Sequence, residues 1–364
     1  MKIGVLTFHG AKNYGAMLQA YALSTYISNN INSDTLVIDF RTKKGEKAYK
    51  IFRKPKGLKG FLKEINKFKF YFNLKERQNR FDDFLKNNFI LTDRYLTYSE
   101  LESDHSEFDV IISGSDQVFN PHGTQYETYL LKFCKDVVRK VAYAPSFGVK
   151  QIPRTKNEIM KSLLNKFTYL SARERKGCEI IYDLTSRKVP QVLDPVFLLS
   201  VDEYKKIEEP VKLKWSKYIL CYSLVGIEKQ LDIAIEVKKR LNIPIILLKD
   251  SIKMRFKRVD KIVRNAGPSE FLNLFRNADF VVTDSFHGTA FSINFKKNFY
   301  STIIIEEKSD RIIDLLNKIG LSKQVINSSQ NVSDETIEVD YTEADKKLDQ
   351  WRVESISYLK QALK

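Results

Sequence analysis

The chain has 364 residues, 43% of them apolar and 29% charged, which is typical of folded globular protein and suits two domains. The first apolar run is short, and no stretch reaches the roughly 18 apolar residues of a membrane-spanning helix, so we expect neither a signal peptide nor a transmembrane segment. The three cysteines lie more than 40 positions apart, which argues against a disulfide framework and a zinc site and favours a reducing cytoplasm.

The net charge of +16 is concentrated in one stretch of the chain. Residues 43–80 contain fourteen Lys or Arg and three Glu, so this basic segment carries +11 of the total. A charge this localised indicates one surface that meets an anionic partner. A nucleic-acid-binding protein is one interpretation, but it rests on charge alone.

The first half of the chain reads as alternating buried strands and helices. A short strand at residues 3–6 precedes a polar turn and a helix whose apolar residues recur at helical spacing. Further apolar runs predict buried strands at residues 35–40, 108–115, 140–148, 167–174 and 188–195. This order is typical of a doubly wound α/β sheet.

The second half repeats this pattern after a break near residues 200–217. It predicts strands at 218–225, 243–249 and 279–285, helices at 229–241 and 268–278, and a capped amphipathic helix in the tail. The expected domains are 1–205 with the basic segment inserted, 206–340, and a C-terminal helix over 341–364. Two such halves imply that ligands bind in a cleft at the carboxyl ends of the strands.

Two loops of the first half lie at such strand ends. Residues 9–15, HGAKNYG, lack the Lys-Ser/Thr of a nucleotide P-loop, but the helix start that follows offers backbone donors for an anion. A turn that needs glycine explains the same residues. Residues 113–117, SGSDQ, place Asp116 at the cleft edge, where a helix cap is the alternative interpretation.

Arg173 lies near the end of the strand expected at 167–174, and its guanidinium suits a carboxylate or phosphate ligand. A structural pair with Glu174 is the alternative. Glu270 lies near the start of the 268–278 helix, where it either complements the helix dipole or binds sugar hydroxyls.

The loop at residues 283–289, TDSFHGT, is the most informative. It places His287 between a buried strand and a helix, and Ser285, Gly288 and Thr289 surround it with hydrogen-bond donors. The positive end of the helix dipole adds to a setting that favours anions. A histidine that only packs in the core is the alternative.

Seven segments follow one another along the chain: NYGAMLQAYAL (13–23), ISGSDQVFNP (112–121), AYAPSFG (142–148), SARERKG (171–177), VLDPVFLL (192–199), GPSEFLNLFRNADFVVTDSFHGTAFSINF (267–295) and RIIDLLNKIGL (311–321). Together they closely resemble the polysaccharide pyruvyl transferase family, over residues 1 to about 321. The resemblance implies two Rossmann-like domains facing across a cleft, which is a GT-B-like architecture, and a C-terminal helix that returns to the first domain. The basic segment matches no shared motif.

The resemblance also implies the ligands. Phosphoenolpyruvate is the expected donor, and the expected acceptor is a sugar of a glycan or of a lipid-linked precursor of capsule or exopolysaccharide. In the family, the histidine of the Ser-Phe-His-Gly motif and arginines of the cleft are associated with the donor. These positions map to His287 and Arg173, beside Ser285, Gly288 and Thr289.

The acceptor is expected to contact Asn13, Tyr14 and Gln117. We expect no metal and no cofactor apart from phosphoenolpyruvate as co-substrate. The reaction needs one group that protonates the methylene carbon and another that accepts a hydroxyl proton. His287, Asp116 and Glu270 are the candidates, with acid and base unassigned. A nucleotide-sugar glycosyltransferase that places Glu270 on a ribose is the alternative function.

The basic segment contains an amphipathic pattern over residues 58–72. Its apolar face comprises Leu58, Phe61, Leu62, Ile65, Phe68 and Phe72, and its basic face comprises Lys59, Lys63 and Lys67. This pattern predicts a helix that lies on an anionic membrane, which would place a cytoplasmic enzyme at the inner face of the membrane. A helix that packs its apolar face on the first domain is the alternative.

Overall fold

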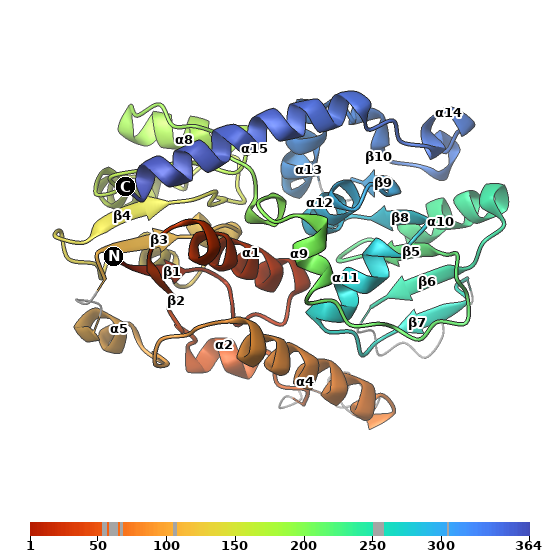
Figure 1. Ribbon diagram of the computed structural model, residues 1–364, viewed down its shortest axis with the longest axis horizontal. Coiled ribbons are helices and arrows are strands. Elements are labelled where there is room, and N and C mark those ends of the chain that lie inside the picture. Colours follow the sequence, from red (N-terminus) through yellow and green to blue (C-terminus); the bar gives the residue numbers. More distant parts are fainter. Residues whose placement is uncertain (53–56, 58–64, 66–67, 105–107, 250–257, 304–305) are drawn as a thin grey trace. The chain divides into compact units, whose positions relative to one another are not determined.

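The computed structural model describes residues 1–52, 57, 65, 68–104, 108–249, 258–303 and 306–364. These residues form two compact units, each with one parallel β-sheet and helices packed on it (Figure 1). The first unit comprises Met1–Lys47, Asn87–Leu199 and Asp345–Lys364, and the second comprises Ala48–Lys86 and Ser200–Ala344.

The first unit is built on a four-stranded sheet with the order β2-β1-β3-β4. Its strands are β1 (Lys2–Leu6), β2 (Asp34–Val37), β3 (Val110–Ser113) and β4 (Arg139–Ala142). All pairs are parallel, and Ile3 of β1 lies opposite Thr35 of β2 and Val110 of β3. β3 is buried at every residue, as expected for a parallel strand that helices cover on both faces.

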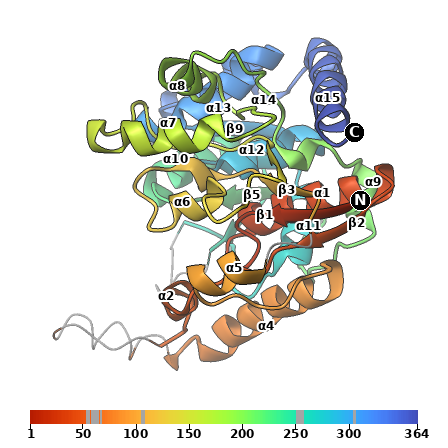
Figure 2. The same cartoon turned by 90° about the vertical axis from the view of Figure 1, so that its left-hand side faces the viewer.

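The helices of this unit include α1, which begins directly after Asn13. The Oδ1 atom of Asn13 accepts a hydrogen bond from the amide of Ala16 (3.0 Å), so Asn13 is a side-chain cap. α7 and α8 lie side by side (Figure 2). The helices are α1 (Tyr14–Asn30), α2 (Lys43–Ala48), α5 (Tyr98–Asp104), α6 (Tyr126–Tyr129), α7 (Asn157–Asn165) and α8 (Arg175–Thr185), with the 3₁₀ turns η1 (Gln117–Phe119), η2 (Arg154–Lys156) and η3 (Pro195–Phe197).

The C-terminal helix α15 (Thr342–Ala362) belongs to the first unit from Asp345 onward, as the family resemblance implied (Figure 1). The indole of Trp351 donates to the carbonyl of Gln191 (2.9 Å), and the hydroxyl of Tyr358 donates to the carbonyl of Ala142 (2.9 Å). The helix therefore completes the first unit although it ends the chain.

The second unit has a six-stranded parallel sheet with the order β10-β9-β8-β5-β6-β7. Its strands are β5 (Ile219–Tyr222), β6 (Ile245–Leu248), β7 (Lys261–Val263), β8 (Phe280–Thr283), β9 (Asn298–Thr302) and β10 (Val325–Ile326). Its helices are α4 (Tyr71–Asn88, to Lys86 in this unit), α9 (Val201–Lys205), α10 (Ile227–Leu241), α11 (Pro268–Arg276), α12 (Phe286–Asn294), α13 (Glu306–Ile319) and α14 (Asp334–Ile337), with the turns η4 (Ser322–Gln324) and η5 (Ser329–Asn331).

Two strands expected in the first half are single bridges instead. Tyr169 pairs with Val141, and Gln191 pairs with Ala172, without extending into a ladder. Beyond the first bridge, the amide of Ala144 bonds to the hydroxyl of Ser171 (3.1 Å) and not to a strand carbonyl. Pro190 has no amide to donate beside the second bridge.

The segment Ala48–Lys86 groups with the second unit, whereas the basic segment 43–80 was expected in the first domain. α4 explains this grouping. The guanidinium Nε of Arg80 lies 3.1 Å from Oε1 of Glu270, and the side-chain amide of Asn265 donates to Glu76 (2.8 Å). These contacts join residues almost 190 positions apart, which no local pattern reveals.

Most residues of the predicted membrane helix, among them Leu58, Lys59, Phe61, Leu62, Lys63 and Lys67, lie outside the described part of the chain. The remaining apolar residues, Ile65, Phe68 and Phe72, are 44%, 68% and 84% exposed. Within the described residues, no helix combines the length and apolarity that crossing a bilayer requires.

Candidate functional site

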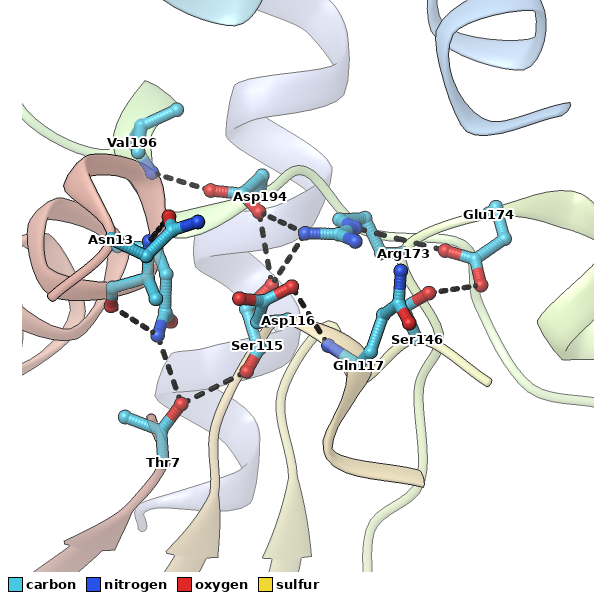
Figure 3. A network of polar contacts seen from close by, with 12 residues as sticks. Thr7, Asn13, Ser115, Asp116, Gln117, Ser146, Arg173, Glu174, Asp194 and Val196 are labelled. Carbon is cyan, nitrogen blue, oxygen red and sulfur yellow. Dashed lines mark hydrogen bonds and ion pairs between the residues drawn. The ribbon is translucent and has the colours of Figure 1, made fainter. Parts of the chain in front are cut away.

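The carboxyl edge of the first sheet carries a buried charged network (Figure 3). Ser115 follows β3, and its hydroxyl donates to Oδ2 of Asp194 (3.0 Å). Nη1 of Arg173 donates to the same oxygen (2.7 Å), and its Nε lies 3.7 Å from Oε2 of Glu174. Burial would lower the pKa of Arg173, but Asp194 and Glu174 outweigh it and raise that pKa, so the guanidinium is held as a cation.

Glu174 is tied to the loop after β4. Its Oε1 accepts from the hydroxyl of Ser146 (2.7 Å) and from the amide of Phe147 (3.3 Å). Asp116 also acts electrostatically on Arg173. One guanidinium is therefore surrounded by three carboxylates, those of Asp116, Glu174 and Asp194, and the cluster has a negative formal charge.

Asp116 has a backbone conformation that is almost confined to glycine, with φ 72° and ψ −173°. Hydrogen bonds hold it there, because its carbonyl accepts from the amides of Val118 (2.7 Å) and Ser146 (2.8 Å). Its Oδ1 accepts from the amide of Gln117 (2.8 Å), so the capping interpretation of this residue is confirmed. Such strain costs about 1–3 kcal/mol and is concentrated at functional sites, which marks this half-buried carboxylate as a functional candidate.

The predicted acceptor residues lie around the same edge. Asn13 is exposed at the start of α1, and Tyr14 is buried beside it. The hydroxyl of Thr7 donates to the carbonyl of Ser115 (2.9 Å), which connects the end of β1 to the end of β3. Figure 3 shows Asn13, Gln117 and Arg173 as parts of one neighbourhood.

A second network at this edge was not predicted from the sequence. His9 and Asp39 follow the adjacent strands β1 and β2, and Nε2 of His9 lies 2.9 Å from Oδ1 of Asp39. The guanidinium of Arg41 donates to both carboxylate oxygens at 2.5 Å. Burial would raise the pKa of Asp39, but the hydrogen bonds from His9 and Arg41 prevail and hold this pKa well below its usual range. The carboxyl ends of neighbouring parallel strands meet at one edge of a sheet. The positions of His9 after β1 and Asp39 after β2 could therefore have indicated this contact from the sequence.

The carboxyl edge of the second sheet holds the loop at 283–289. Ser285 caps α12 by accepting from the amide of Gly288 (3.2 Å), and His287 is 7% exposed in the first turn. A Cβ on Gly288 would lie 2.4 Å from Oγ1 of Thr283, so only glycine fits this close approach. The hydroxyl of Thr289 lies 2.6 Å from that of Ser301 on β9.

Glu270 is 7% exposed and its carboxylate has two partners within the second unit. It accepts from the amide of Gly267 (2.8 Å), which caps α11, and it pairs with Arg80 of α4 (3.1 Å). The structure thus brings Asp116, Gln117 and Arg173 together in one unit and His287, Ser285, Gly288 and Thr289 together in the other. Among the described residues, no group of three His, Cys, Asp or Glu side chains could hold a metal ion.

Two parallel α/β units with their polar loops at the carboxyl edges define a GT-B-like protein, and solved structures support this class. UDP-GlcNAc 2-epimerase from Neisseria meningitidis, bound to UDP-GlcNAc, has a TM-score of 0.51 at 12% identity, covering 98% of this chain and 94% of its own. The Methanocaldococcus jannaschii UDP-GlcNAc 2-epimerase has a TM-score of 0.51 at 13% identity, covering 98% of this chain and 100% of its own. Arabidopsis thaliana UGT89C1 has a TM-score of 0.50 at 10% identity, covering 100% of this chain and 97% of its own. At these identities the similarity concerns the fold alone.

The sequence profile of the polysaccharide pyruvyl transferase family matches residues 13–303, which is most of the chain and includes Asp116, Arg173 and His287. The chain belongs to this family. No curated protein sequence matches it.

Proposed function

We propose that the protein transfers the enolpyruvyl group of phosphoenolpyruvate to a sugar of a glycan or of a lipid-diphosphate-linked glycan precursor, forming a pyruvate ketal. The observation that carries the proposal is the family match over residues 13–303. The candidate proton-transfer residues Asp116 and His287 both lie within that range. Phosphoenolpyruvate is consumed as a co-substrate, and the proposal includes no other cofactor.

The proposed reaction is balanced in protons and bonds. A general acid protonates the methylene carbon of phosphoenolpyruvate, and an oxocarbenium-like centre develops at C2. One sugar hydroxyl attacks C2 and loses its proton, and the C2–O bond to phosphate breaks. A second hydroxyl of the same sugar then attacks and loses its proton, which closes the cyclic ketal. One hydroxyl proton replaces the proton given to the methylene, and the other leaves with phosphate.

We assign the proton transfers to Asp116 and His287. Asp116 is half-buried in a strained backbone conformation, which supports a functional role for its carboxylate. His287 lies in the first turn of α12 next to the Ser285 cap. Glu270 has a positioning role in this proposal, because its carboxylate caps α11 and pairs with Arg80. The same contacts disfavour the alternative in which Glu270 binds a ribose.

Incubation of the purified protein with phosphoenolpyruvate and a panel of glycans tests the proposal. We expect release of inorganic phosphate and a product in which an acid-labile ketal bridges two sugar oxygens. Parallel incubations with nucleotide sugars test the glycosyltransferase alternative. Sugar transfer from a nucleotide sugar, without phosphate release from phosphoenolpyruvate, would contradict the proposal.

We further propose that the enzyme reaches lipid-linked acceptors at an anionic membrane surface. An aromatic cluster, formed by Phe52, Phe68, Tyr71 and Phe72, supports this part. The rings of Phe52 and Phe68 lie 4.7 Å apart, and those of Phe52 and Tyr71 stack at 5.8 Å. Phe68 and Phe72 remain 68% and 84% exposed, next to the exposed Lys69 and Lys75. Exposed aromatic rings among lysines suit the interface of an anionic bilayer.

A further inference from the structure

Two lysines that were not among the predicted site residues lie at the carboxyl edge of the second sheet. Lys249 directly follows β6, and its ammonium donates to the carbonyl of Ser223 at the end of β5 (3.0 Å). Lys229 lies in the first turn of α10, and its ammonium donates to the carbonyl of Ile303 after β9 (3.1 Å). In the sheet, β8 lies between β9 and β5, so the two ammonium groups bracket the exit of β8.

The exit of β8 is the loop at 283–289 that carries Ser285 and His287. Contacts connect each lysine to this loop. The hydroxyl of Ser223 donates to Asp284 (3.2 Å), so Lys249 and the loop share one partner residue. On the other side, Gln230, next to Lys229, donates to Thr302 on β9 (2.9 Å). The hydroxyl of Thr302 in turn donates to the carbonyl of Thr283 (3.4 Å).

Both lysines are half-buried, and among the described residues no ion pair joins either ammonium to a carboxylate. An ammonium has three donors, and each of these two has one backbone carbonyl as its acceptor. The neighbouring Asp284 forms no ion pair with either described ammonium; its carboxylate accepts from Ser223 and from the amides of residues 224–226. Cations withdrawn from water at a ligand-binding edge, without an acidic partner, are suited to an anionic ligand.

The Arg173 network of the first unit offers a poorer environment for such a ligand. Arg173 is the cation of that network, but Asp194, Glu174 and Asp116 surround it. A donor with a carboxylate and a phosphate group would meet three negative charges there and one positive charge already engaged. Lys229, Lys249 and Asp284, around the exit of β8 in the second unit, have the opposite balance, with two ammonium groups and a single carboxylate.

We infer that Lys229 and Lys249 form the anion subsite of the donor and bind the phosphate and carboxylate groups of phosphoenolpyruvate above the β8 loop. This inference rests on the proposed function. It assigns the binding of the anionic groups of the donor to the two lysines and not to Arg173. His287, in the loop between them, then lies next to the bound enol and can exchange a proton with it.

Variants at both positions test the inference in the full-length protein. Lys229→Met and Lys249→Met should each raise the KM for phosphoenolpyruvate about tenfold or more, with a smaller change in kcat, because each removes a charge-assisted hydrogen bond. Lys249→Arg keeps the charge and should recover most of the affinity. Lys239→Met is the matched control on the same helix, since this lysine is 68% exposed and pairs with Glu236 (3.0 Å).

Titration calorimetry with inorganic phosphate and with phosphoenolpyruvate separates this inference from the proposed function. Binding of both probes to the wild-type protein, lost in the Lys229→Met/Lys249→Met double variant with an unchanged melting temperature, supports the anion subsite even if no glycan accepts a pyruvyl group. Equal binding by the wild-type protein and the double variant overturns the subsite. Unchanged KM values in both single variants, with phosphoenolpyruvate turnover intact, overturn the subsite and leave the proposed function standing.

Discussion

Arg173 and Asp194 form a buried ion pair, with 2.7 Å between Nη1 and Oδ2 and side chains that are 2% and 0% exposed. Asp194 also accepts from the hydroxyl of Ser115 (3.0 Å) and from the amide of Val196 (3.1 Å). Asp194 therefore connects Ser115, after the end of β3, to the turn η3. Arg173 was expected to bind the donor, and this geometry gives it an internal partner.

The first prediction concerns the stability that depends on this pair. Asp194→Ala should lower the free energy of unfolding by roughly 3–5 kcal/mol, because it leaves the buried guanidinium without its main counter-ion. Asp202→Ala is the control, since it breaks only an exposed pair with Lys205 and should leave the free energy of unfolding nearly unchanged. Denaturant unfolding measures both. If Asp194→Ala lowers the free energy of unfolding by less than about 1 kcal/mol, the ion pair is not what keeps Arg173 in place, and ligand binding becomes the better explanation of this residue.

The second prediction concerns the backbone strain at Asp116. Asp116→Gly should raise the free energy of unfolding by roughly 1 kcal/mol, because glycine adopts φ 72° without strain, and it should reduce turnover about a hundredfold because the carboxylate is lost. Thermal melting and the rate of phosphate release measure the two effects.

Ser186 provides the control for this substitution. It is exposed at the end of α8 with φ 59°, so Ser186→Gly should also gain stability but keep full activity. If Asp116→Gly retains full activity, Asp116 is a structural cap and not a proton-transfer residue.

Several elements could be predicted because their signals are local. The strand expected at 279–285 is β8, and the helix expected at 268–278 is α11, since each has a continuous apolar run or a capping signal at its own boundaries. The grouping of 48–86 with the second unit could not be predicted in this way. It depends on contacts such as Arg80 to Glu270, whose residues are far apart in the chain.

The sequence indicated several residues of the candidate site, but it did not indicate which of them contact one another. The position of His287 in a strand-to-helix loop and that of Asp116 after β3 followed from local patterns. Arg173 was expected to bind the donor, with a pair to its neighbour Glu174 as the alternative; the structure contains that pair at 3.7 Å and a shorter contact to Asp194, 21 positions away. The sequence shows which groups can form ion pairs, and only the folded chain determines which of them meet.

The third prediction tests His287 as a proton-transfer residue. His287→Ala should reduce turnover of phosphoenolpyruvate by on the order of a hundredfold while the melting temperature stays close to that of the wild-type protein. His122→Ala is the control, because His122 is exposed in a polar turn and should leave turnover unchanged. Near-normal activity in a well-folded His287→Ala protein would remove His287 from the mechanism.

The fourth prediction concerns stability in acid. The pKa of Asp39 is lower in the folded protein than in the unfolded chain, so its stabilising contribution is complete above the ordinary Asp pKa of about 4. As the pH falls below that value toward the folded pKa, the unfolded state takes up a proton first and the contribution is lost. Asp39→Asn should therefore flatten the decrease of the unfolding free energy below about pH 4.

Unfolding curves across this pH range test the assignment, with Asp83→Asn as the control at an exposed aspartate. The control should retain the acid dependence of the wild-type protein. If Asp39→Asn shows the same dependence, the contacts with His9 and Arg41 do not stabilise the fold through this charge.

The last prediction concerns the aromatic cluster and the anionic membrane. The wild-type protein should co-sediment with vesicles that contain anionic lipid, and added salt should release it, because basic residues near the surface each contribute on the order of 1 kcal/mol and salt screens them. Phe68→Asp/Phe72→Asp should abolish most of this binding, because it removes two exposed rings and adds two negative charges. Val137→Asp is the control, since Val137 is 90% exposed in the other unit. Binding that survives in the double variant, or that the control loses equally, would show that the aromatic cluster does not contact the bilayer.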